Sequence, residues 1–133
     1  MTTVSKKHVL IVEDDPELRE ALAQALSDEG YLFSVARDGL EAIRFLQDGG
    51  RPAVILLDLS MPFVNGWEFR IHQKRTAAIA DIPVVIITAG HHSREEIAWL
   101  EPADIIQKPI NLQRLLDTVR RHCGTPQASS QSG

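Results

Sequence analysis

The sequence predicts an α/β fold in which helices cover both faces of a doubly wound, five-stranded parallel sheet. Two observations carry this prediction. Five short apolar β-type runs alternate along the chain with five segments of helical character. These runs are apolar almost throughout, as expected for strands that are buried on both faces of a parallel sheet. The length of 133 residues is that of one domain.

The first strand and the first helix are separated by a run of acidic residues. Residues 8–12 form a short apolar run, which predicts a strand. A helix is expected over 16–30, where apolar residues recur on one face. Asp15 is placed to cap its N-terminus, and Pro16 suits the first helical turn. Gly30 suits the end of the helix.

The second strand and the second helix follow directly. Residues 31–35 are strand-like, and the next segment, 38–41, has the spacing of a capping box that opens a helix. This helix is expected to end at the glycine pair 49–50. The third strand, 53–57, is apolar throughout and leads to Asp58.

The third helix follows Gly66, because Trp67 and Ile71 lie one helical turn apart. The fourth strand is the apolar run 83–87, which leads to Thr88.

The C-terminal third of the chain predicts a short helix, a short strand and a longer helix. The short helix spans 93–100, with Ser93 as its expected cap. The strand spans 105–107 and precedes Lys108. Apolar residues at helical spacing predict the closing helix: Leu112, Leu115, Leu116, Val119 and Cys123.

The composition limits the class of protein. No stretch approaches the roughly 20 apolar residues of a membrane span, and no apolar signal region follows the first residues, so we expect a cytoplasmic protein without a membrane partner. The single cysteine, Cys123, excludes an intrachain disulfide framework and a multi-cysteine zinc site. The net charge of −4 argues against nucleic acid as a partner, since non-specific binding requires a clustered positive surface.

The chain divides into three parts by pattern. We expect an N-terminal extension over 1–7, one domain over 8–123 and a flexible C-terminal tail over 124–133, where the helical periodicity is lost.

Polar residues follow four of the predicted strands. Glu13 and Asp14 follow the first strand, Asp58 the third, Thr88 the fourth and Lys108 the fifth. Right-handed crossovers favour the flavodoxin-like strand order 2-1-3-4-5, in which the first and third strands are neighbours. These side chains are therefore expected at the carboxyl edge of one sheet, where open α/β folds bind ligands.

The residue types at this edge indicate phosphoryl chemistry. Three carboxylates in close proximity repel one another, so one of them holds a proton or a cation lies among them. Carboxylate and carbonyl oxygens together with waters suit Mg²⁺. A lysine in the same cleft is a suitable partner for a phosphate group. The set predicts a site with a nucleophilic carboxylate, a metal, a lysine and a hydroxyl group.

The chain resembles the receiver domain of response regulators, the phosphoacceptor module of two-component signalling, over about residues 9–123. Four segments carry the resemblance, in the order of the family's signatures. They are Val9–Pro16 with its acidic run, Leu56–Pro62 followed by Gly66, Thr88–Ala89, and Lys108–Pro109.

The resemblance implies a role for each residue of the site. Asp58 is the phosphoacceptor, Lys108 pairs with it and later with a phosphoryl oxygen, and Thr88 hydrogen-bonds the phosphoryl group. Mg²⁺ is held by Asp14 directly, by Glu13 through a coordinated water, by Asp58 and by the main-chain carbonyl of Ser60. The Lys108–Pro109 peptide bond resembles the cis bond of the family, which aims the lysine inward.

The implied function is a signalling module that receives its phosphoryl group from a sensor histidine kinase and acts on a downstream protein target through protein contacts. It is not expected to be an enzyme with its own substrate, because its chemistry is limited to self-catalysed phosphoryl transfer and dephosphorylation. A phosphorelay intermediate that passes the group to a histidine phosphotransfer protein is an alternative in the same fold.

Two alternatives belong to other classes. A Mg²⁺-dependent aspartyl-phosphate hydrolase needs a second aspartate two residues after its nucleophile, where this sequence has Ser60. A non-phosphorylated pseudo-receiver is disfavoured because every residue of the site is present.

The sequence departs from the family at Ile105, where receivers carry a tyrosine or phenylalanine that turns inward as the threonine moves. Isoleucine is β-branched and stiff at χ1. We therefore expect phosphorylation to act through the loop after Thr88 and the helix at 93–100, with little contribution from position 105.

Overall fold

The computed structural model describes residues 8–59, 66–90 and 94–124. The expected N-terminal extension, the expected cap Ser93, the expected metal ligand Ser60 and most of the expected tail lie outside the described residues. The strands are β1 (His8–Val12), β2 (Leu32–Ala36), β3 (Val54–Asp58), β4 (Val84–Thr88) and β5 (Asp104–Gln107). The helices are α1 (Pro16–Asp28), α2 (Gly39–Gln47), α3 (Gly66–Lys74), α4 (Arg94–Trp99) and α5 (Leu112–Cys123).

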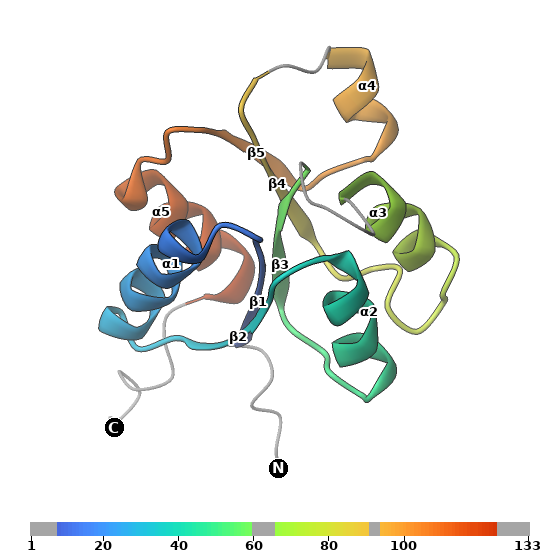
Figure 1. Cartoon of the computed structure of the whole chain (residues 1–133), viewed down its shortest axis with the longest axis horizontal. Coiled ribbons are helices and arrows are strands. Elements are labelled where there is room, and N and C mark those ends of the chain that lie inside the picture. Colours follow the sequence, from blue (N-terminus) through green and yellow to red (C-terminus); the bar gives the residue numbers. More distant parts are fainter. Residues whose placement is uncertain (1–7, 60–65, 91–93, 125–133) are drawn as a thin grey trace.

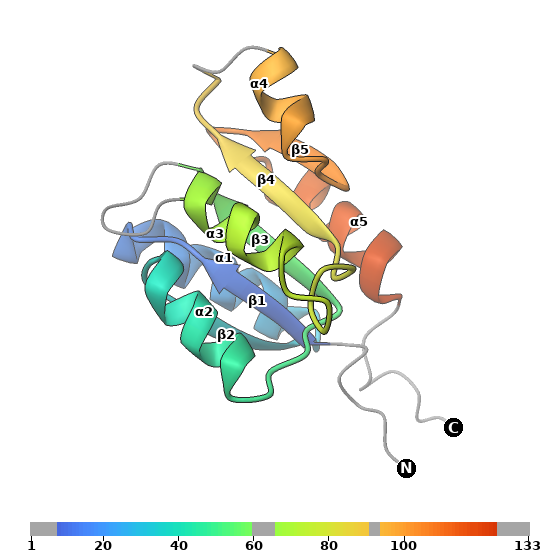
Figure 2. The same cartoon turned by 90° about the vertical axis from the view of Figure 1, so that its right-hand side faces the viewer.

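The five strands form one parallel sheet in the order β2-β1-β3-β4-β5, as predicted. Helices α1 and α5 cover one face of this sheet, and α2 and α3 cover the other (Figure 1). Figure 2, turned by 90° from Figure 1, shows the strands following one another in this order from β5 at the top to β2 at the bottom, so β2 and β5 are the two edge strands.

Alternating side chains of the central strands supply two separate cores. Leu10, Ile55 and Ile86 point to the face covered by α2, α3 and α4, where Phe69 of α3 is fully buried. Val9, Leu56 and Val85 point to the other face and pack with side chains of α1 and α5. The central strands are therefore buried on both sides, which explains why the sequence shows continuous apolar runs there.

The predicted element boundaries agree with the structure to within two residues, and those of β1 are the same. Helix α1 ends at Asp28, before the expected Gly30, and β2 begins one residue later than expected. Tyr31 belongs to the turn between them: its N–H donates to the carbonyl of Leu26, and its buried ring packs in the core with α5. Gly30 adopts a φ of 88°, which lets the chain leave the helix at this point.

Three helices begin at an expected or newly found cap. The side chain of Asp15 accepts the N–H of Glu17 at 3.0 Å, and that of Asp38 accepts the N–H of Glu41 at 2.9 Å. The side chain of Asn111 caps α5 in the same way. Among the described helices, none has both the length and the apolar character needed to span a bilayer.

Candidate functional site

The sheet brings the predicted site residues to its carboxyl edge. Asp58 and Thr88 are the last residues of β3 and β4. The sequence pattern predicts them to be the first residues after these strands. Glu13 and Asp14 follow β1 directly, and Lys108 follows β5. Because β1 and β3 are neighbours, the acidic turn after β1 lies beside Asp58.

Three carboxylates form a compact cluster at this edge. Glu13, Asp14 and Asp58 each offer one oxygen, and these oxygens all lie within 4.8 Å of one another. Glu13 is 1% exposed and Asp58 is 2% exposed, whereas Asp14 faces solvent. The cluster can hold a metal ion, with one side open to the waters that Mg²⁺ keeps in its coordination shell.

Glu13 has a buried carboxylate oxygen without a hydrogen-bond partner among the described residues. Its Oε2 accepts the N–H of Asp15 at 3.2 Å, but its buried Oε1 has no hydrogen-bond donor among the described residues. Burial, and after it the neighbouring Asp58, raises the pKa of Glu13 to about 8. A buried carboxylate oxygen without a donor fits a position that faces a cation or a cation-bound water.

Lys108 supplies the positive charge of the site. Its Nζ lies 3.4 Å from Oδ2 of Asp58 and 3.8 Å from Oε1 of Glu13. The main-chain N–H of Lys108 donates to the carbonyl of Thr88 at 2.8 Å, which joins the ends of β4 and β5. The peptide bond between Lys108 and Pro109 is cis.

Thr88 places a hydroxyl group at the same edge. Its side chain is buried, and its Oγ1 accepts the N–H of Gly90 at 3.2 Å. Gly90 has a φ of 88°, so the chain turns sharply just after the threonine. The hydroxyl thus forms a local contact with the loop that leads to α4.

Two further residues shape the site and were not predicted as parts of it. Arg19 of α1 donates from Nη1 to the carbonyls of Glu13 and Asp14, at 2.9 and 3.3 Å, and so fixes the acidic turn. Gly66, at the start of α3, approaches the end of β3 so closely that a Cβ atom there would lie 2.6 Å from the carbonyl oxygen of Asp58. No local sequence pattern predicts the contact of Arg19. Gly66, in contrast, belongs to the motif Leu56–Pro62 followed by Gly66 that carries the family resemblance.

A buried arginine connects α3 with the end of α4. Arg70 is 6% exposed and donates to the carbonyls of Leu100 and Glu101, at 2.7 and 2.9 Å. Its Nη1 also donates to Oε1 of Gln73, whose amide in turn donates to two main-chain carbonyls of the segment before β4. Burial lowers the pKa of Arg70, but the carbonyl oxygens around it still receive a charged donor.

Comparison with known proteins gives one consistent family. The family model described as "Response regulator receiver domain" matches residues 9–120. "Response regulator MprA" of Mycobacterium ulcerans is 34% identical over 114 residues, which make up 84% of this chain and 48% of the relative. The chain thus spans about half the length of the curated relatives it matches.

Solved structures show the same similarity. The signal receiver domain of a signal transduction histidine kinase from Syntrophus aciditrophicus has a TM-score of 0.79 and 31% identity, covering 96% of this chain and 95% of that one. The chemotaxis response regulator CheY4 of Vibrio cholerae has a TM-score of 0.79 and 29% identity, covering 86% and 96% of the two chains.

Proposed function

Since this chain belongs to the response regulator receiver domain family, we propose that it accepts a phosphoryl group on Asp58 from a sensor histidine kinase. One observation carries the proposal: three acidic side chains and the ammonium group of Lys108 converge at the carboxyl edge of the sheet. The proposed nucleophile, Asp58, is buried at the point where β3 ends, with the lysine 3.4 Å away.

The proposed reaction transfers one phosphoryl group between two side chains. A carboxylate oxygen of Asp58 attacks the phosphorus of the kinase phosphohistidine, and the P–N bond breaks with its electron pair returning to the imidazole nitrogen. An acyl phosphate forms on Asp58. We propose that Lys108, which pairs with the carboxylate of Asp58 in this structure, then binds an oxygen of the transferred group. We propose that the hydroxyl of Thr88, which accepts the N–H of Gly90, donates its own hydrogen to another oxygen of that group.

We propose that the metal of the site is Mg²⁺, which Asp14 and Asp58 would hold directly and Glu13 would hold through a water. When bound, Mg²⁺ supplies positive charge to the phosphoryl oxygens and to the crowded carboxylates. The donor set of carboxylate oxygens supports this choice over softer metals, which prefer sulfur or imidazole ligands. The main-chain carbonyl of Ser60, implied as a further ligand, lies outside the described residues.

We further propose that the module acts in the cytoplasm through contacts with a downstream protein, and that it catalyses only its own phosphorylation and dephosphorylation. The net charge of −4 supports protein contacts over nucleic-acid contacts for this domain. We propose that phosphorylation changes the conformation of the loop after Thr88 and of α4, and that the downstream protein binds this changed surface. In support of a passive role for Ile105, the main chain of that residue is held by side chains of Asp104 and Arg114.

The phosphoacceptor is tested with acetyl phosphate and Mg²⁺, followed by intact-mass spectrometry. We expect one added phosphoryl group on the wild type and none on Asp58→Asn. Asp15→Asn is the matched control, because Asp15 belongs to the same edge of the sheet but serves as the cap of α1. Equal labelling of Asp58→Asn would place the acceptor at another residue.

The output route is tested by NMR with beryllofluoride in place of the phosphoryl group. We expect large backbone shifts from Thr88 to Leu100 and one unchanged rotamer of Ile105. A change of the Ile105 rotamer on activation would contradict its passive role.

A further inference from the structure

The edge strand β2 is apolar and open. Three of its five side chains are large, apolar and exposed: Leu32 at 51%, Phe33 at 36% and Val35 at 47%. The strand contains no charged residue and no proline. Sheet edges of natural proteins are protected against pairing by such residues, or by bulges and covering segments. An exposed apolar edge without such protection offers a template on which a strand of another chain can pair.

The free hydrogen-bonding groups of β2 can be identified from its pairing with β1. The carbonyl of Ala36 accepts the N–H of Glu13, so Ala36 directs its main-chain groups towards β1. Main-chain groups alternate in direction along a strand, so Ser34 also faces β1, whereas Phe33 and Val35 direct their N–H and C=O groups outward. Among the described residues β2 has no second neighbouring strand, so these four groups have no strand partner there.

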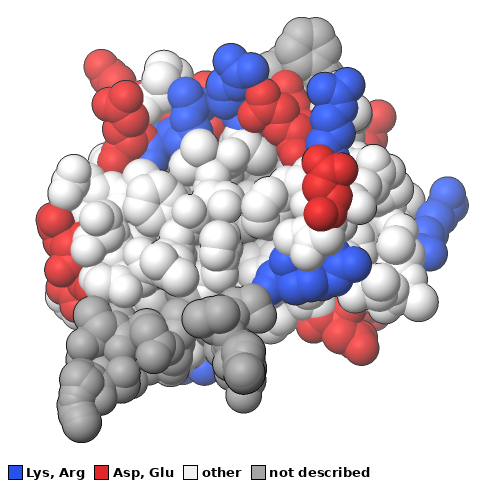
Figure 3. All heavy atoms as spheres, turned by 90° about the horizontal axis from the view of Figure 1, so that it is seen from below, with Lys and Arg blue, Asp and Glu red and all other residues white. Residues whose placement is uncertain are grey.

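The surface around this edge is also largely uncharged. Figure 3 views the molecule from below, the side on which β2 lies in Figure 2, and it shows a continuous uncharged area from the left to the centre of this face, with charged side chains to its right and along the upper rim. The ring of Phe33 borders a shallow groove against α1, lined by Glu20, Ala23, Gln24 and Ser27. An added strand would therefore meet an apolar edge with room beside α1.

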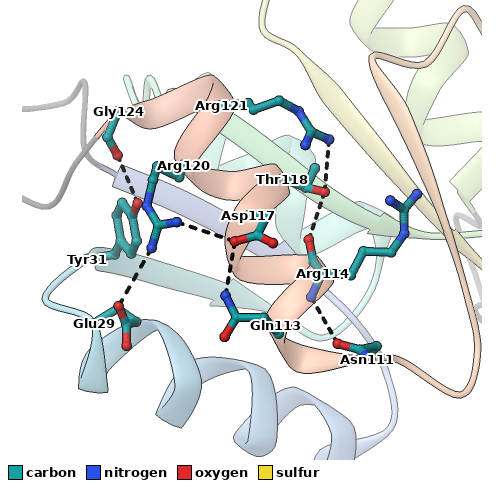
Figure 4. Close-up of polar contacts among 10 residues, drawn as sticks. All are labelled: Glu29, Tyr31, Asn111, Gln113, Arg114, Asp117, Thr118, Arg120, Arg121 and Gly124. Carbon is teal, nitrogen blue, oxygen red and sulfur yellow. Dashed lines mark hydrogen bonds and ion pairs between the residues drawn. The ribbon is translucent and has the colours of Figure 1, made fainter.

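On the opposite edge of the sheet, the outward main-chain groups of Ile105 are occupied by side chains of the same chain. The N–H of Ile105 in β5 donates to Oδ1 of Asp104, and its carbonyl accepts Nη2 of Arg114, both at 2.8 Å. Arg114 lies in the first turn of α5, where its main-chain N–H bonds the cap Asn111 (Figure 4). Arg121 adds an ion pair to Asp104. The protection found at β5 is absent from the described contacts of β2.

We propose that β2 pairs with β2 of a second copy of this chain, in antiparallel orientation, to give a two-fold symmetric dimer with one continuous sheet. The register that uses all four outward groups of β2 places Phe33 of each copy opposite Val35 of the other, and the two pairs exchange four main-chain hydrogen bonds. Ser34 then lies on the two-fold axis opposite its own copy, with Leu32 opposite Ala36. An antiparallel strand at the edge of a parallel sheet is a common arrangement.

The pattern of β2 favours a second copy over another partner. In the register set by the main chain, every apolar residue meets an apolar residue, and the one polar side chain meets itself. Each Phe33–Val35 pair joins an aromatic and a β-branched side chain, a favourable cross-strand combination. A two-fold interface must be self-complementary in this way. The strand offers no charged residue through which a partner of opposite charge could bind it specifically.

Sedimentation velocity over a range of protein concentrations tests the dimer. We expect reversible dimerisation of the wild type, and an association at least about tenfold weaker for Val35→Lys, which places a charge in both apolar pairs. Trp99→Lys is the matched control, because Trp99 is an exposed apolar residue of α4 (62%) away from β2. Thermal melting checks that each variant folds. A wild type that stays monomeric, or a dimer that is lost in Trp99→Lys and kept in Val35→Lys, would overturn the proposal.

Disulfide trapping tests the register independently. In the proposed dimer the two Ser34 Cα atoms form a non-hydrogen-bonded pair about 4.5 Å apart, which is within the range of a disulfide. We expect Ser34→Cys to form covalent dimers under mild oxidation. Leu32→Cys should not, because the two copies of that position lie about 13 Å apart along the strands. The wild type, whose Cys123 is buried, controls for other disulfides. Trapping at Leu32 but not at Ser34 would refute the register.

Discussion

Replacing Glu13 by glutamine should make the metal-free protein more stable at neutral pH. Glu13 is buried beside Asp58, and its Oε1 lacks a hydrogen-bond donor among the described residues. The amide of glutamine has nearly the same shape, does not ionise, and can donate to the neighbouring carboxylate as protonated Glu13 does. The substitution therefore removes the titratable group from both the folded and the unfolded chain while leaving the packing in place.

The size of the effect follows from the pKa of Glu13, which burial and Asp58 raise from 4.5 to about 8. Between these two values the folded chain holds a proton that the unfolded chain has released, so the unfolding free energy falls as the pH rises. One pH unit corresponds to about 1.4 kcal/mol. Without metal, ionisation of Glu13 in the unfolded chain thus lowers the stability by about 3 kcal/mol between pH 4.5 and pH 7.

Urea unfolding in EDTA at several pH values measures this difference. We expect wild type and Glu13→Gln to have similar stability near pH 4.5, and the variant to be more stable by about 3 kcal/mol near pH 7. Glu20→Gln controls for the loss of one negative charge, because Glu20 is an exposed residue of α1. Parallel pH curves for wild type and Glu13→Gln would refute the argument that Glu13 is protonated in the folded, metal-free site.

Three further predictions follow from contacts around the site. Mg²⁺ at about 100 times its dissociation constant should stabilise the wild type by about 2.7 kcal/mol in scanning calorimetry, and Asp14→Ala should abolish the response; a response that persists in this variant would place the ion elsewhere. Gly66→Ala should lower the free energy of unfolding in urea by about 1–3 kcal/mol, because its Cβ would lie 2.6 Å from the carbonyl oxygen of Asp58. An unchanged midpoint would show that the start of α3 is free to move. Arg70→Leu should lower the free energy of unfolding by about 3–5 kcal/mol, because main-chain carbonyls at the end of α4 lose a buried donor. Arg75→Leu, at an exposed position of the loop after α3, should be nearly neutral. Equal losses for the two arginines would contradict the role of the buried contacts.

The strand order and the location of the site could be predicted because both depend on local patterns. Buried parallel strands read as continuous apolar runs, and the residues that end them are brought to one edge by the topology alone. Asp58 and Thr88 are found there because nothing beyond the length and the pairing of their strands is needed to place them.

Features that depend on distant contacts could not be predicted in this way. The sequence pattern predicts Tyr31 to be a strand residue, but its ring packs in the core beside α5, and β2 starts one residue later. Arg70 has the pattern of a surface residue, and its acceptors lie 30 and 31 positions along the chain. The missing donor at Glu13 depends on how three chain segments pack together, which no sequence window contains.

The separation of the two cores by the sheet has a consequence for protein engineering. Side chains of α1 and α5 pack only with one set of strand residues, and those of α2, α3 and α4 with the alternate set, in the clusters formed by the described residues. A designer who keeps Arg19 and the cap Asp15, which hold the acidic turn, can therefore redraw the rest of the outer surface of α1 and α5 without repacking the other core. The ends of β3 and β4, with Asp58 and Thr88, would stay in place while the domain presents a new recognition surface.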